Sequence, residues 1–180
     1  MQPLPRFALA RIAPIAIALW LGLGPLTAHA AEPEPAWQRA TTLPDLIATL
    51  DHWLDAESPY PPRTTAPRLR LISPQRARAM SDSGGRLGAT RRGLYDPDTQ
   101  TIFLVRPWSM RNPQDVSVLL HELTHHRQAT ARHWYCPGQQ ELPAYRLQAA
   151  WLAERGESIS INWIAASLAA GCTPDDFHPN

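Results

Sequence analysis

The chain has 180 residues, with 17 basic and 16 acidic side chains and two cysteines. This length is enough for one domain with a hydrophobic core and, once a leader is removed, too short for two. The near-neutral net charge gives no reason to expect nucleic acid or an anionic membrane as a partner. We therefore expect a single compact domain that acts as a monomer.

Residues 1–30 are predicted to form a signal peptide. Arg6 and Arg11 give a positive start, residues 12–26 are apolar, and Ala28 and Ala30 put small residues at the two positions that a signal peptidase recognises. The apolar run is short for a membrane span, although an uncleaved anchor is the alternative. We expect an exported protein, periplasmic or secreted, with no membrane association after cleavage.

The mature chain is predicted to begin with a flexible tether, residues 31–41, followed by one domain over 42–180. Hydrophobic periodicity, caps and turn residues define the elements of this domain. We expect, in chain order, a helix from Thr42 to Ser58, a strand at 67–72, a glycine-rich loop at 81–88, a hairpin at 93–105, and helices at 113–130, 140–155 and 158–170. Strands grouped before helices favour an α+β fold over an alternating parallel-sheet fold.

The segment 121–125 reads His-Glu-Leu-Thr-His, an HExxH motif, within the helix predicted at 113–130. Histidines four residues apart lie one turn apart on one helical face, so both His121 and His125 can reach one tetrahedral metal ion. Glu122 can then act as a general base toward water at the metal. The alternative is a pair of surface histidines on an ordinary amphipathic helix.

The rest of that helix supports the metal interpretation. An apolar stripe lies on the side opposite the histidines, so one face can enter the core while the other faces a cleft. The stripe consists of Val116, Leu119, Leu120 and Leu123.

Zinc at such a site needs a third protein ligand. The metzincin pattern would require glycine at 128 and histidine at 131, but this chain has Gln128 and Ala131. Glu141 is the better candidate, because Pro143 belongs in the first turn of a helix and so places Glu141 at the helix start. Glu154 and Glu157 are the reserves.

HExxH followed by Glu141-Leu142-Pro143-Ala144, an ExxA sequence, resembles the gluzincin clan of zinc peptidases. The chain is also similar to uncharacterised exported bacterial proteins described as possible metallopeptidases. This resemblance covers residues 92–155. It implies a zincin-like domain, with a small antiparallel sheet packed on the HExxH helix and further helices after it. It also implies zinc (Zn²⁺) as the cofactor and a peptide or protein as the substrate.

From these residues we expect hydrolysis of a peptide bond by zinc-activated water, with Glu122 as the general base. Two alternatives are a non-catalytic zinc-containing binding protein and a zinc hydrolase of a non-peptide amide, such as a cell-wall crosslink. Oxyanion stabilisation would fall to His133, Tyr135 or Tyr145, and the sequence does not choose among them. His126 points away from the ligands, so we place it on the surface or behind the site.

Two further expectations concern covalent structure and substrate binding. In an exported protein an even pair of cysteines favours a Cys136–Cys172 disulfide over zinc ligation. The strand at 101–105 is expected to edge the cleft and pair with an extended substrate, the alternative being an interior strand without a free edge.

Overall fold

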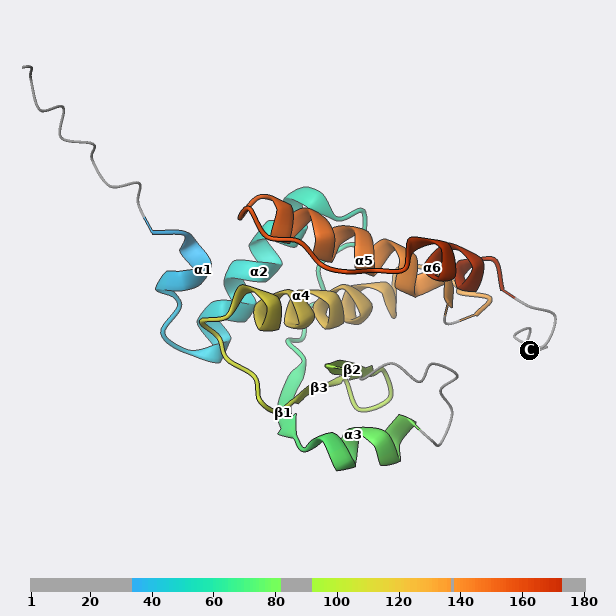
Figure 1. Cartoon of the computed structure of the whole chain (residues 1–180), viewed down its shortest axis with the longest axis horizontal. Coiled ribbons are helices and arrows are strands. Elements are labelled where there is room, and N and C mark those ends of the chain that lie inside the picture. The colour runs from blue at the N-terminus through green and yellow to red at the C-terminus, as the bar shows by residue number, and fades with distance from the viewer. Residues whose placement is uncertain (1–33, 82–91, 137, 173–180) are drawn as a thin grey trace, which may run out of the picture. The chain divides into compact units, whose positions relative to one another are not determined.

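The structure, a computed structural model, describes residues 34–81, 92–136 and 138–172. Its elements are α1 (Ala36–Arg39), α2 (Leu43–Glu57), β1 (Arg68–Ile72), α3 (Pro74–Ser81), β2 (Gly93–Asp96), β3 (Thr101–Val105), α4 (Pro113–Gln128), α5 (Gly138–Ala153) and α6 (Trp163–Ala170) (Figure 1). The predicted α+β class is confirmed. The expected signal peptide lies outside the described residues, as does most of the glycine-rich loop.

The N-terminal helices pack on the core of the domain. Thr42 and Asp45 form a capping box at the start of α2, and the helix ends at Glu57, with Ser58 as its C-cap before a proline. The segment expected to be a tether contains α1, and its Trp37 is buried against Trp151 of α5. The folded part therefore begins before residue 42, because burying an indole ring stabilises the short helix that carries it.

The sheet has the strand order β1-β3-β2. β2 pairs antiparallel with β3, as the hairpin predicted, but β1 pairs parallel with β3, so the sheet is mixed instead of wholly antiparallel. β3 is the central strand, and Ile102 and Leu104 on it are fully buried. The prediction that residues 101–105 edge a substrate cleft is therefore wrong, because neighbouring strands already use both of their backbone edges.

Helix α4 contacts α2, α5, β2 and β3, and Figure 1 shows it between α5 and the sheet. The side chain of Asn112 accepts a hydrogen bond from the Gln114 N–H, and Pro113 occupies the first turn, where its missing N–H costs nothing. The predicted apolar stripe of α4 has no exposed surface at any of its four positions. This burial holds the opposite face of α4, with its histidines, at a fixed distance from α5.

A disulfide encloses the segment that carries the last two helices. Cys136 and Cys172 are bonded, as predicted, which ties the segment before α5 to the end of α6. α6 starts later than expected, because the Asn162 side chain caps it by accepting the Ala165 N–H. Within the described residues, no helix has the length and apolar character needed to cross a membrane.

Candidate metal centre

His121 and His125 project from one face of α4 toward the first turn of α5. Their Nε2 atoms lie 3.0 Å apart, and both residues are more than nine-tenths buried. The four-residue spacing on a regular helix produces this approach, as the sequence predicts.

Glu141 in the first turn of α5 completes the group. Its Oε2 atom lies 3.2 Å from His121 Nε2 and 3.7 Å from His125 Nε2. The fully buried Ala144 keeps α5 close to α4 at this point. α5 begins at Gly138, so Pro143 lies beyond the first turn and not in it as we expected, but Glu141 is still near the helix start.

The two reserve glutamates lie elsewhere. Glu154 accepts a hydrogen bond from the Trp53 indole, and Glu157 accepts one from Gln114. In the described part of the chain, the potential metal ligands that lie close together are therefore His121, His125 and Glu141.

The donor set fits a tetrahedral metal ion. With metal–ligand distances of roughly 2.0–2.1 Å, tetrahedral geometry separates neighbouring ligand atoms by about 3.3 Å. The three separations between the Nε2 and Oε2 atoms, 3.0, 3.2 and 3.7 Å, lie on both sides of that value. Two imidazoles and one carboxylate can therefore bind one metal ion here and leave a fourth position open.

The electrostatics of the group favour a charged carboxylate. Burial alone would raise the pKa of Glu141, but the hydrogen bond from His121, the nearby ring of His125 and the charge of both rings outweigh it and lower the pKa far below its usual range. For His125, burial acts to lower the pKa, and the close, negatively charged Glu141 raises it overall. The carboxylate is therefore ionised and ready to bind a cation at neutral pH.

Glu122 lies beside this group and is 5% exposed. The edge strand β2 passes directly over it: a Cβ atom placed on Gly93 would lie 2.5 Å from Glu122 Oε1 and 2.8 Å from Val118 Cγ1. A larger residue at 93 would require the side chain of Glu122 or Val118 to shift, so β2 packs directly on the Glu122 carboxylate.

Gln128 is a polar neighbour of the site that our sequence analysis did not assign. It is fully buried, and its Oε1 atom lies 2.8 Å from His125 Nδ1. The available signal was its position three residues after His125, which puts both side chains on one side of the helix.

The three candidates for oxyanion stabilisation differ in position. The ring of Tyr145, one turn after Glu141, lies 4.6 Å from the ring of His121, measured between centroids. His133 packs instead against Tyr135, whose side chain is 59% exposed. Tyr145 is thus the candidate that the structure places against a member of the His121–His125–Glu141 group.

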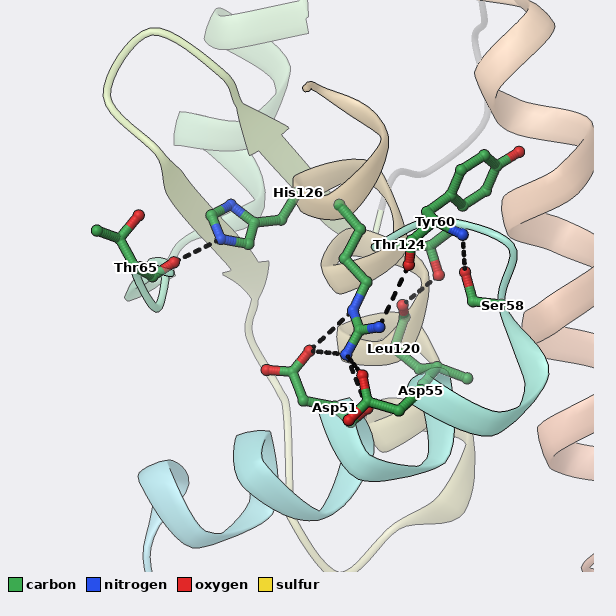
Figure 2. A network of polar contacts seen from close by, with 9 residues as sticks. Asp51, Asp55, Ser58, Tyr60, Thr65, Leu120, Thr124 and His126 are labelled. Carbon is green, nitrogen blue, oxygen red and sulfur yellow. Dashed lines mark hydrogen bonds and ion pairs between the residues drawn. The ribbon is translucent and has the colours of Figure 1, made fainter. Parts of the chain in front are cut away.

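His126 is buried, with 3% of its surface exposed. Of the two positions that the sequence analysis allowed, the surface is therefore wrong. Its ring lies between the Thr65 carbonyl, 2.8 Å from Nε2, and the Tyr95 hydroxyl, 3.0 Å from Nδ1, as Figure 2 shows for Thr65. Burial lowers the pKa of His126, so the neutral ring donates to Thr65 and accepts from Tyr95. These contacts attach α4 to β2 and to the segment before β1.

The sequence was compared with known protein families, curated proteins and solved structures. Residues 39–180 match the model of a family described as a domain of unknown function, DUF6647. The chain belongs to this family. No curated protein and no solved structure matched it. The match extends over α4 and α5, so the whole His121–His125–Glu141 group lies within the family's domain.

Proposed function

We propose that this chain is an exported zinc-dependent metallopeptidase of the zincin type, similar to the gluzincins. His121, His125 and Glu141 would hold the zinc ion, and Glu122 would be the general base. The observation that carries the proposal is the convergence of two imidazole nitrogens and one carboxylate oxygen, separated by 3.0, 3.2 and 3.7 Å, on two helices that pack together.

The donor set favours zinc over the common alternatives. Calcium and magnesium prefer sites made of oxygen atoms, whereas imidazole nitrogen suits zinc and other late transition metals. Three protein ligands with an open fourth position are typical of catalytic zinc, and structural zinc sites use four. A purely structural site would also have no use for a buried carboxylate at Glu122.

The proposed reaction is hydrolysis of a peptide bond. Zinc, when bound, supplies Lewis-acid activation of water and of the substrate carbonyl. Glu122 accepts the proton that the attacking water loses, and it later delivers this proton to the departing nitrogen. The contact with β2 keeps the carboxylate on one side of α4 through both transfers.

The disulfide supports export. Disulfides persist in oxidising compartments and are rare in the cytosol, so the Cys136–Cys172 bond agrees with the signal peptide expected over residues 1–30. A peptide or protein substrate would then be met outside the cytosol.

Metal analysis of the purified mature protein tests the site. We expect one zinc ion per chain, lost in His121→Ala and in His125→Ala and weakened in Glu141→Ala. Glu154→Ala and Glu157→Ala are matched controls, because both glutamates bond elsewhere. Full zinc content in both histidine variants would contradict the site.

A broad peptide-library assay tests the activity. Glu122→Gln should keep the zinc and the fold but lose hydrolysis, since Glu122 transfers protons and does not bind the metal. If the wild-type protein holds zinc and cleaves no peptide under any condition in which it is folded, the proposal of a peptidase fails.

A further inference from the structure

We infer that Gln128 is a positioning residue that fixes the orientation of His125 and sets the spacing between α4 and α5. The inference rests on the metal site proposed above and concerns how that site is built. Gln128 is fully buried at the last position of α4, and each polar atom of its side chain has a partner.

The first step concerns the orientation of the Gln128 amide. Its Nε2 atom lies 3.0 Å from the carbonyl oxygen of Gln140, which can only accept a hydrogen bond. The amide nitrogen must therefore face Gln140, and Oε1 must face His125. The Gln140 carbonyl thus defines which end of the amide meets the imidazole.

The second step concerns the tautomer of His125. Because Oε1 can only accept, the hydrogen bond of 2.8 Å requires a proton on Nδ1. A neutral imidazole with this proton has its lone pair on Nε2, the atom that faces His121 and Glu141. Gln128 therefore prepares His125 to bind a metal through Nε2, as residues behind metal ligands commonly do.

The third step concerns Glu141. Gln140 immediately precedes it, so the bond from the Gln128 side chain holds the first turn of α5 against the end of α4. The Trp134 indole donates to the Gln128 carbonyl oxygen at 2.9 Å, which fixes the connection between the two helices. One residue therefore positions a histidine ligand directly and the carboxylate ligand through the backbone.

The chain offers a matched control in Gln148. This glutamine is also buried, at 3% exposed, and its amide also links α5 to α4, by donating to Ser117 Oγ at 3.0 Å. This hydrogen bond goes to Ser117, which is not a member of the metal group. Gln148→Leu therefore removes a comparable buried amide without touching the site.

The experiment compares zinc affinity, by chelator competition, in wild type, Gln128→Leu, Gln128→Glu and Gln148→Leu. Gln128→Leu should bind zinc about 10–100-fold more weakly, the usual loss when a partner of a metal-bound histidine is removed. Gln148→Leu should bind like the wild type. Gln128→Glu keeps an acceptor for His125 but loses the donor to Gln140, so its affinity should lie between those of Gln128→Leu and wild type.

A second measurement does not depend on metal. Nitrogen chemical shifts of His125, recorded without metal at a pH where the ring is neutral, should show the proton on Nδ1 in wild type and in Gln148→Leu. Gln128→Leu should lose this preference. If zinc affinity and the tautomer are the same in Gln128→Leu and Gln148→Leu, Gln128 has no positioning role, and the proposed function is unaffected.

The failure of the proposed function would look different. Wild-type protein would then bind no zinc, while His125 still held its proton on Nδ1 in a manner that depends on Gln128. If Gln128→Leu does not fold, Gln128→Glu carries the affinity measurement, and an affinity equal to that of wild type would overturn the link to Gln140.

Discussion

The close approach of β2 to Glu122 gives a sharp prediction for Gly93→Ala. The added methyl group would lie 2.5 Å from Glu122 Oε1, whereas ordinary contacts begin at 3.4 Å. The strand is held by its pairing with β3, so the side chain of Glu122 must retreat by about 0.9 Å. A displacement of about 1 Å in a catalytic group can lower the rate about 100-fold.

We therefore expect Gly93→Ala to lower kcat/KM about 100-fold on a peptide that the wild type cleaves. Zinc content should stay at one per chain, because the metal ligands are not displaced. Overpacking should also lower the free energy of unfolding by roughly 1–3 kcal/mol. The assays are peptide cleavage, metal analysis and thermal unfolding on the same preparation.

Gly156→Ala is the control for a general effect of replacing glycine. Gly156 has a φ of +68°, and nothing lies within 4 Å of an added Cβ. The substitution should cost about 1 kcal/mol of stability through the backbone alone and leave kcat/KM unchanged. If Gly93→Ala cleaves peptide within a few-fold of wild type while Glu122→Gln is inactive, β2 does not position the general base.

Two further predictions concern the disulfide and pH. Thiol labelling of unreduced, denatured protein should find no free cysteine, and two labelled thiols would contradict the bond. Replacing Cys136 and Cys172 by serine should lower the free energy of unfolding by about 3–4 kcal/mol on the chain-entropy model. As the pH is lowered, zinc affinity should begin to fall before pH 6.5 is reached. The pKa of His125 is raised above this ordinary value, and its imidazole must be deprotonated to bind metal. Constant affinity down to pH 6.5 would contradict the shift.

The helix that carries HExxH could be predicted from sequence because its signals are local. Asn112, Pro113 and the apolar stripe lie within one continuous segment, and the histidine spacing follows from helical geometry. Glu141 could be chosen for a similar reason, since a helix after a short connection tends to pack against the one before it. The expected first-turn position of Pro143 was wrong, but an error of this size still leaves Glu141 near the helix start.

The arrangement of the sheet could not be predicted in the same way. The hairpin of β2 and β3 is a local pairing, signalled by the turn residues between the strands. The parallel pairing of β1 with β3 depends instead on how the segment between them, with α3 and β2, returns to the sheet. No short pattern encodes that path, so the central position of β3 was only the alternative in our sequence analysis.

The buried polar residues at the end of α4 were missed for the same physical reason. His126 meets Thr65, and Arg127 meets Asp51 and Asp55 on α2. These partners lie 61 to 76 residues earlier in the chain. Helical angles indicate that these side chains point away from the face that carries His121 and His125. Only the packed structure identifies the hydrogen-bond and ion-pair partners that make their burial favourable.

The Arg127 network also gives a prediction, because burial is unequal between the partners. The side chain of Arg127 is 1% exposed, whereas those of Asp51 and Asp55 are 37% and 49% exposed. Asp51 and Asp55 project from α2 in Figure 2, and their Oδ1 atoms lie 3.0 and 2.8 Å from Arg127 Nη2. Removing the carboxylates leaves a buried charge without its partners, while removing the arginine leaves two carboxylates that water already reaches.

The double variant Asp51→Ala/Asp55→Ala should therefore lose about 3–5 kcal/mol of stability, the usual cost of an unpaired buried charge. Arg127→Met, which keeps most of the apolar volume, should lose less. Urea unfolding of the variants and wild type measures both losses. If Arg127→Met is the more destabilised of the two, the guanidinium itself stabilises the contact between α2 and α4, chiefly through its hydrogen bonds to the carbonyls of Asp51 and Tyr60, and the argument from unequal burial fails.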